Sequence, residues 1–163
     1  MAINRAGTLL YVAEDESDTV DVVDINPQDA GSPIQNQPAA VNTVIETIPV
    51  IARPDDLANS SLAQYTGANT NSVTLSPDEH TLYVTNGNLN NIAVVNLNGN
   101  NRGDYVAGLI PTGWYPNSVS ISNDGTWAYV VNMKSPTGAN PHECYAYGPT
   151  GYPTCMPSGE YNP

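Results

Sequence analysis

The apolar residues of this chain fall in short runs that are separated by turn-forming residues. In the best-defined stretch, the first run ends at Pro77-Asp78, where proline presets φ and aspartate can cap a reversal. Four strands are predicted in succession here, at residues 71–76, 81–86, 91–97 and 105–110. These runs are apolar at most positions, which is typical of strands covered on both faces. No window shows a helical period, so the pattern predicts an all-β chain.

An internal sequence repeat indicates how these strands are grouped. Residues 66–86 align without a gap with residues 112–132, at an offset of 46, and about half of the positions are identical. A partial third copy lies upstream, where residues 9–13 match 81–85 and residues 19–25 match 91–97. A period in the forties that is built from short strands is typical of a β-propeller, whose blades are four-stranded antiparallel sheets.

The predicted strands do not suffice for a closed propeller, which needs at least about four blades. We predict about nine strands, grouped as three, four and two, or about two and a quarter blades. Such an arrangement leaves apolar faces and sheet edges uncovered. The sequence therefore predicts an incomplete propeller or a fragment, which further blades or other chains would complete.

Two motifs carry a resemblance to a known family. Tyr83-Val84-Thr85-Asn86 matches the signature of the YVTN-repeat β-propellers, and the general resemblance covers residues 5–132. Residues 110–116, Ile-Pro-Thr-Gly-Trp-Tyr-Pro, are similar to the propeller part of bacterial extracytoplasmic proteins that join such repeats to an alkaline-phosphatase-like phosphoesterase domain. This resemblance implies a periplasmic, cell-surface or secreted location.

Three segments depart from the repeat. We assign residues 1–132 to propeller blades, with insertions at 26–42 and 51–65, and residues 133–163 to an irregular tail or inserted loop rich in Tyr, Gly and Pro. Long insertions on a rigid scaffold often carry binding residues. They can equally cover a sheet edge, and the sequence leaves both interpretations open.

Composition narrows the possible partners. The chain has 16 Asp and Glu residues against four Lys and Arg, for a formal net charge of −12. Without a basic surface, nucleic acid and anionic membranes are disfavoured as partners. No apolar run approaches the ~20 residues that span a bilayer, so no membrane span is predicted. We expect protein partners, such as the remaining blades or other chains.

The two cysteines, Cys144 and Cys155, lie close together in the tail. In a lysine-poor chain, such a pair is typical of a local disulfide formed in an oxidising compartment. A loop of this length would stabilise the fold by roughly 3 kcal/mol. Free thiols or metal ligation are the alternatives.

Aromatic residues supply the binding candidates. Trp114 and Tyr115 replace the Ala and Asn of the preceding copy, in the loop that leads into a blade's first strand. They can face a ligand or pack between blades. Tyr145 and Tyr147 lie in the tail, where exposed tyrosines would form a recognition loop or a lid over the propeller.

The chain carries no recognisable catalytic motif. It has no Gly-x-Ser-x-Gly sequence and no phosphate-binding glycine motif. His142-Glu143-Cys144 is the tightest group of metal-ligand types, but consecutive residues rarely point at one ion. The acidic residues 14–18 are interpreted as a solvated turn between strands. No metal and no cofactor are therefore predicted.

These observations favour a non-catalytic binding or scaffold module in an extracytoplasmic protein. One alternative is the propeller portion of an enzyme, either a phosphoesterase fusion or a metal-dependent lactonase-like protein. Another is a structural or surface-layer component that assembles blades from several chains. We expect no enzymatic activity from this chain alone.

Overall fold

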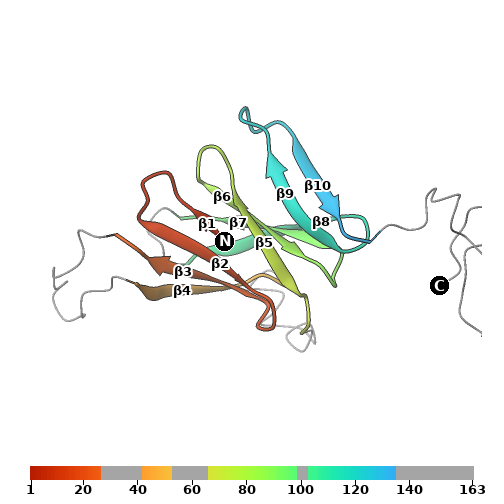
Figure 1. The fold of residues 1–163 in the computed structure, drawn as a ribbon, viewed down its shortest axis with the longest axis horizontal. Coiled ribbons are helices and arrows are strands. Elements are labelled where there is room, and N and C mark those ends of the chain that lie inside the picture. Colours follow the sequence, from red (N-terminus) through yellow and green to blue (C-terminus); the bar gives the residue numbers. More distant parts are fainter. Residues whose placement is uncertain (27–41, 53–65, 99–102, 135–163) are drawn as a thin grey trace, which may run out of the picture. The chain divides into compact units, whose positions relative to one another are not determined.

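The computed structural model describes residues 1–26, 42–52, 66–98 and 103–134. All of these but Lys134 belong to one unit, Met1–Met133. The all-β prediction is confirmed, because the described residues form ten strands in three antiparallel sheets (Figure 1). The first sheet contains β1 (Ala2–Ile3), β2 (Leu9–Glu14), β3 (Thr19–Asp24) and β4 (Thr43–Pro49). The second contains β5 (Thr70–Leu75), β6 (Thr81–Asn86), β7 (Asn91–Asn96) and β8 (Tyr105–Pro111), and the third contains β9 (Pro116–Ile121) and β10 (Ala128–Asn132).

In each sheet the strands follow one another in chain order, so every connection is a simple reversal. The second sheet has the four strands that the sequence predicts, with ends that differ by one residue at most. The first sheet has one strand more than expected. Ala2 and Ile3 pair with Tyr11 and Leu10, and two residues are too few to show an alternating pattern.

The main core lies between the first two sheets. Cross-strand partners share a face of an antiparallel sheet, and the first sheet turns Tyr11 and its partner Val22 toward the second. The second sheet contributes its own paired residues Val84 and Ala93. The members of this core are Leu9, Tyr11, Val20, Val22, Ile48, Val50, Val73, Leu82, Val84, Ala93, Val95, Leu97 and Val106. The two sheets thus pack face to face, as blades do in a propeller.

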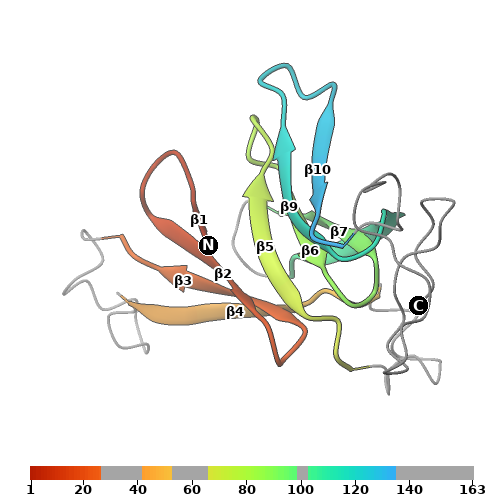
Figure 2. The ribbon, with the colours of Figure 1, turned by 45° about the vertical axis from the view of Figure 1, so that its right-hand side comes forward.

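The third sheet is a hairpin that packs beside the first strands of the second (Figure 2). Val119 of β9 faces the second sheet and is only 3% exposed. On β10, by contrast, Tyr129 and Val131 are 60% and 61% exposed. One face of this hairpin is therefore buried, and the other is open among the described residues.

A repeated turn joins the first two strands of each sheet. In the second sheet, the Ser76 hydroxyl accepts a hydrogen bond from the Thr81 amide (3.0 Å) and donates to Asp78 (2.5 Å). Ser122 and Asp124 make the same contacts in the third sheet. In the first sheet, Asn4 replaces the serine, and its Oδ1 accepts hydrogen bonds from the amides of Thr8 (2.8 Å) and Leu9 (3.0 Å). The partial upstream copy of the repeat therefore includes this turn as well.

Among the described residues, we find no helix with the length and apolar character to cross a membrane.

Candidate functional site

The surface at the start of β5 and β9, the first strands of the second and third sheets, is the first candidate site. The β2–β3 turn of the first sheet and the β6–β7 turn of the second also lie here, beside the links that enter the next sheet. Asp18 closes the β2–β3 turn with a left-handed backbone (φ 58°) and is 5% exposed. Its carboxylate accepts hydrogen bonds from the Gly67 and Ala68 amides, both at 2.7 Å. Asp18 thereby fixes the link into β5.

Asn90 has the same role one sheet further on. It is also left-handed (φ 53°), and its Oδ1 accepts from the Tyr115 amide at 2.8 Å. Its carbonyl accepts from the Thr112 amide at 2.9 Å, as the Asp18 carbonyl accepts from Val50 at 3.1 Å. These polar side chains therefore hold the links in place.

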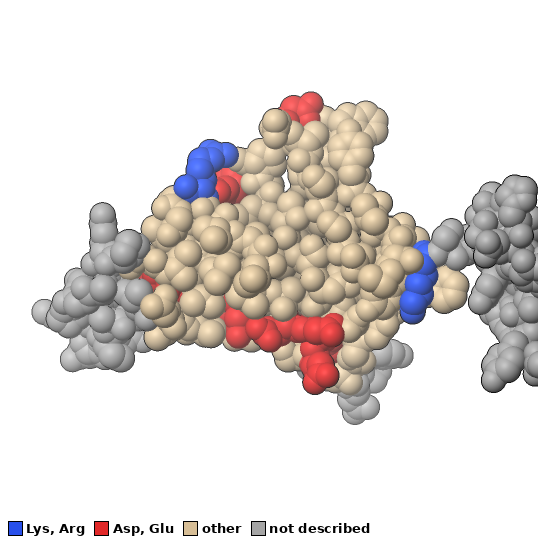
Figure 3. Space-filling model, viewed as in Figure 1, with Lys and Arg blue, Asp and Glu red and all other residues tan. Residues whose placement is uncertain are grey.

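The interpretation of residues 14–18 as a solvated acidic turn is thus wrong for Asp18. It holds for Asp15 and Glu16, which are exposed. Asp15 also accepts a hydrogen bond from the Asn69 amide group. In Figure 3, acidic residues form a band at the lower edge of the view, at the place of the β2–β3 turn in Figure 1. The sequence does not reveal the role of Asp18, because its partners lie 49 and 50 residues away.

Tyr115 lies in the link from the second sheet to the third. Its backbone is left-handed (φ 59°), which is uncommon for a bulky residue, and its hydroxyl donates to Asn69 Oδ1. A Cβ added at Gly87 would lie 2.8 Å from the Tyr115 ring, so a glycine is needed there. Since Asn69 in turn donates to Asp15, a polar chain connects the third sheet to the first. This arrangement favours the packing interpretation of Tyr115.

Trp114 is 45% exposed at the same surface. It lies in the loop between β8 and β9, as the alignment of the two copies indicates. Its role in binding stays a prediction, and so does that of Tyr115. The other candidates, Cys144, Cys155, Tyr145 and Tyr147, lie outside the described residues, as does His142.

Asn86, the last residue of the Tyr-Val-Thr-Asn segment, is fully buried. Its Nδ2 donates to the Val50 carbonyl at 2.9 Å and to Asn91 Oδ1 at 3.1 Å. Its Oδ1 accepts from the Thr70 hydroxyl at 3.0 Å. Asn86 therefore joins three strands of its own sheet and the end of the preceding one, which explains its place in the repeat.

A second candidate site lies at the opposite ends of β5 and β9. A cavity of about 370 Å³ opens between the turn of the second sheet and that of the third, where Asp78 and Asp124 are among the lining residues. Hydrogen bonds from Ser122, and then from Thr126, lower the pKa of Asp124 to about 2. Bonds from Ser76 and His80 lower that of Asp78. Both carboxylates are therefore ionised at neutral pH.

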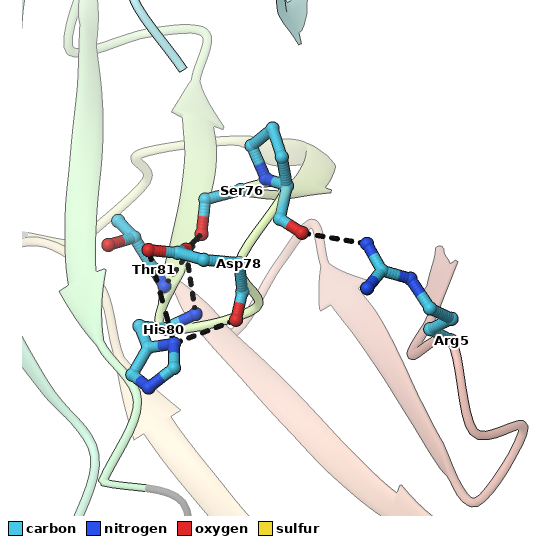
Figure 4. A network of polar contacts seen from close by, with 6 residues as sticks. Arg5, Ser76, Asp78, His80 and Thr81 are labelled. Carbon is cyan, nitrogen blue, oxygen red and sulfur yellow. Dashed lines mark hydrogen bonds and ion pairs between the residues drawn. The ribbon is translucent and has the colours of Figure 1, made fainter. Parts of the chain in front are cut away.

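The corresponding junction between the first two sheets carries a cation (Figure 4). The Arg5 guanidinium donates to the Pro77 carbonyl at 2.8 Å, and the Arg5 amide donates to Glu79 at 2.5 Å. Figure 4 also shows His80 beside Asp78, with its Nδ1 2.7 Å from the Asp78 carbonyl oxygen. Among the described residues, no group of three His, Cys, Asp or Glu side chains could hold a metal ion.

Solved structures provide the decisive comparison. The chain is similar to a 6-phosphogluconolactonase candidate from Bacteroides uniformis ATCC 8492 (TM-score 0.61, 20% identity), covering 83% of this chain and 33% of that one. It is similar to a protein from Lactobacillus plantarum (TM-score 0.63, 20% identity; 83% and 34% covered) and to a 6-phosphogluconolactonase candidate from Bacteroides fragilis NCTC 9343 (TM-score 0.58, 19% identity; 80% and 30% covered). The chain folds as part of a β-propeller.

This partial propeller spans about a third of the length of the solved structures that it matches. Since identity is 19–20%, the similarity shows the fold and leaves the activity open. No protein-family model and no curated protein sequence matches the chain.

Proposed function

We propose that this chain is a non-catalytic β-propeller module that serves as a binding scaffold. The observation that carries the proposal is that the polar side chains near the start of β5 and β9 make structural hydrogen bonds. Asp18, Asn69 and Asn90 all hydrogen bond to the link or turn of a neighbouring sheet. Catalytic carboxylates and amides need to be available to a substrate, whereas these hold backbone and side chains in place.

A rigid surface of this kind suits the display of loops. The links between sheets are fixed at several points, so an exposed side chain such as Trp114 is presented in a defined position. Aromatic side chains that are held in this way offer a large contact area at low entropic cost. We propose that Trp114 takes part in binding a protein partner.

We further propose an extracytoplasmic location. The low lysine content, the net charge of −12 and the two cysteines support it. If Cys144 and Cys155 form a disulfide, neither reacts with an alkylating reagent until the unfolded chain is reduced. Alkylation of both without reductant would argue against the disulfide.

The non-catalytic part of the proposal is tested with lactones, the substrate class for which two of the similar proteins, the 6-phosphogluconolactonase candidates, are named. The purified chain is mixed with gluconolactone or 6-phosphogluconolactone, and acid release is followed against buffer. We expect the rate of spontaneous hydrolysis. Turnover that is proportional to the concentration of the chain, and that is lost when the chain is unfolded, would overturn the proposal.

The second candidate function is the propeller portion of a larger enzyme. Structural similarity to the two 6-phosphogluconolactonase candidates favours a lactonase-like protein. Residues 110–116 favour a phosphoesterase fusion instead, through the resemblance described above. The coding sequence on both sides of this chain separates the two, because a phosphoesterase domain would bring its own Asp and His metal ligands.

A further inference from the structure

The contact between the second and third sheets shows how one sheet of this chain binds the next. The Asn71 amide group donates to the Pro116 carbonyl at 3.2 Å, and the Thr74 hydroxyl donates to the Val119 carbonyl at 2.8 Å. Thr85, on the neighbouring strand β6, is fully buried. Two side-chain donors from β5 thus bind the backbone of β9, the first strand of the following sheet.

The repeat reproduces this binding face on the third sheet. At the offset of 46 residues, Asn117 and Ser120 stand where Asn71 and Thr74 stand in the second sheet. Tyr129 repeats Tyr83 and Val131 repeats Thr85. We call the four residues Asn117, Ser120, Tyr129 and Val131 the outward face. All four are exposed, and no described residue covers them.

The orientation of the hairpin follows from its pairing. Tyr129 pairs with Ser120, and Val130 pairs with Val119, which is buried against the second sheet. Because side chains alternate along a strand, Ser120 and Tyr129 point to the opposite side. Asn117 lies at a register shift between β9 and β10, as Asn71 does between β5 and β6, so both depart from strict alternation in the same way. The outward face therefore repeats the donors, the aromatic ring and the orientation of the face that binds β9.

We propose that the outward face binds a further propeller blade, whose first strand accepts hydrogen bonds from the Asn117 side-chain amide and the Ser120 hydroxyl. The inference rests on the proposed scaffold function and names its partner. The partner is recognised by its chemistry: an uncharged β-sheet face whose first strand presents two backbone carbonyls, spaced as those of Pro116 and Val119 are.

A second copy of the chain does not fit this description. Its available surface is the outer side of the first sheet, where Asp21 takes the position that the fully buried Ala93 has in the second. Docking would remove this carboxylate from water, which is costly without a cationic partner.

A duplication of one repeat period tests the proposal within the whole chain. Residues 87–132 are inserted a second time after Asn132, so that the chain continues in register and supplies its own further blade. Val131→Lys is then introduced at the original position in both the parent and the duplicated chain. Val44→Lys is the matched control, because Val44 is 52% exposed on β4 of the first sheet.

We expect Val131→Lys to leave the urea midpoint of the parent chain unchanged and to lower that of the duplicated chain by several tenths of a molar or more. Val44→Lys should shift neither. Hydrogen exchange should show that the amides of β10 gain protection on duplication. Asn117→Ala with Ser120→Ala should lower the midpoint of the duplicated chain only.

Three outcomes would overturn the proposal. The first is a duplicated chain in which Val131→Lys and Val44→Lys have the same effect. The second is a duplicated chain that fails to fold or leaves the β10 amides unprotected, because the proposal requires that a second copy of residues 87–132 can form the next blade. The third is a parent chain that dimerises through the outward face, seen as a doubled mass in sedimentation that Val131→Lys removes. None of these depends on lactone turnover, so failure here is distinct from failure of the proposed function.

Discussion

Replacement of Asn86 by alanine tests the central physical argument of this fold. Asn86 is fully buried and makes three hydrogen bonds, to the Val50 carbonyl, Asn91 Oδ1 and the Thr70 hydroxyl, at 2.9–3.1 Å. Asn86→Ala leaves the Val50 carbonyl and the Thr70 hydroxyl without this partner inside the protein. A buried polar group that loses its partner costs about 1–3 kcal/mol. We therefore expect a loss of roughly 2–4 kcal/mol in the free energy of unfolding.

The measurement is urea unfolding followed by circular dichroism. With a slope of about 1–3 kcal/mol per molar, the midpoint should fall by on the order of 1 M or more. Asn132→Ala is the matched control, because Asn132 is the equivalent residue of the third sheet and is exposed. It should change stability by no more than about 0.5 kcal/mol. Similar losses for Asn86→Ala and Asn132→Ala would refute the reasoning.

Three further predictions concern other contacts. Burial, together with nearby carboxylates, raises the pKa of Tyr11 to about 12. Since the folded state favours the neutral phenol, its contribution to the free energy of unfolding is complete below pH ~10 and falls by about 2–3 kcal/mol as pH rises from 10 to 12. Urea titrations at pH 9 and 11.5 should show this fall in the parent chain and not in Tyr11→Phe. Ser122→Ala removes the main hydrogen bond that lowers the pKa of Asp124 to about 2, so this pKa should rise in a carboxyl NMR titration, and an unchanged value would contradict the assignment. Gly87→Ala would place a Cβ 2.8 Å from the Tyr115 ring and should cost about 1–3 kcal/mol in the parent chain, but clearly less in a chain that already carries Tyr115→Ala; equal costs in the two chains would contradict the steric explanation.

The strands could be predicted from the sequence because their signals are local. Each strand of the second sheet is an apolar run bounded by a turn, and the repeat independently supports β5, β6 and β7. β1 escaped prediction because its two residues gain their identity only by pairing with β2. The turn at Asn4 shows the same limit, since asparagine there performs the role of Ser76 and Ser122 without resembling them in sequence.

The candidate site was harder to predict because its contacts are distant in the sequence. Asp18 looks like one more residue of an acidic turn until the fold brings the Gly67 and Ala68 amides to its carboxylate. Tyr115 and Asn69 occupy equivalent positions in successive copies, and they contact each other across 46 residues. The alignment shows that the copies differ at this position, but only the structure shows that the two differing residues contact each other.

Residues that are equivalent in successive copies and residues that differ between copies make different kinds of contact. Equivalent residues such as Asp18 and Asn90 bind the backbone of the following link, so they preserve the stacking of sheets. Departures from the repeat occur where sheets meet solvent or one another: Arg5 contacts the turn of the second sheet, and Trp114 is exposed. A binding function that is specific to this protein should therefore depend on such departures. The repeated polar residues should instead affect stability, as the Asn86 experiment measures.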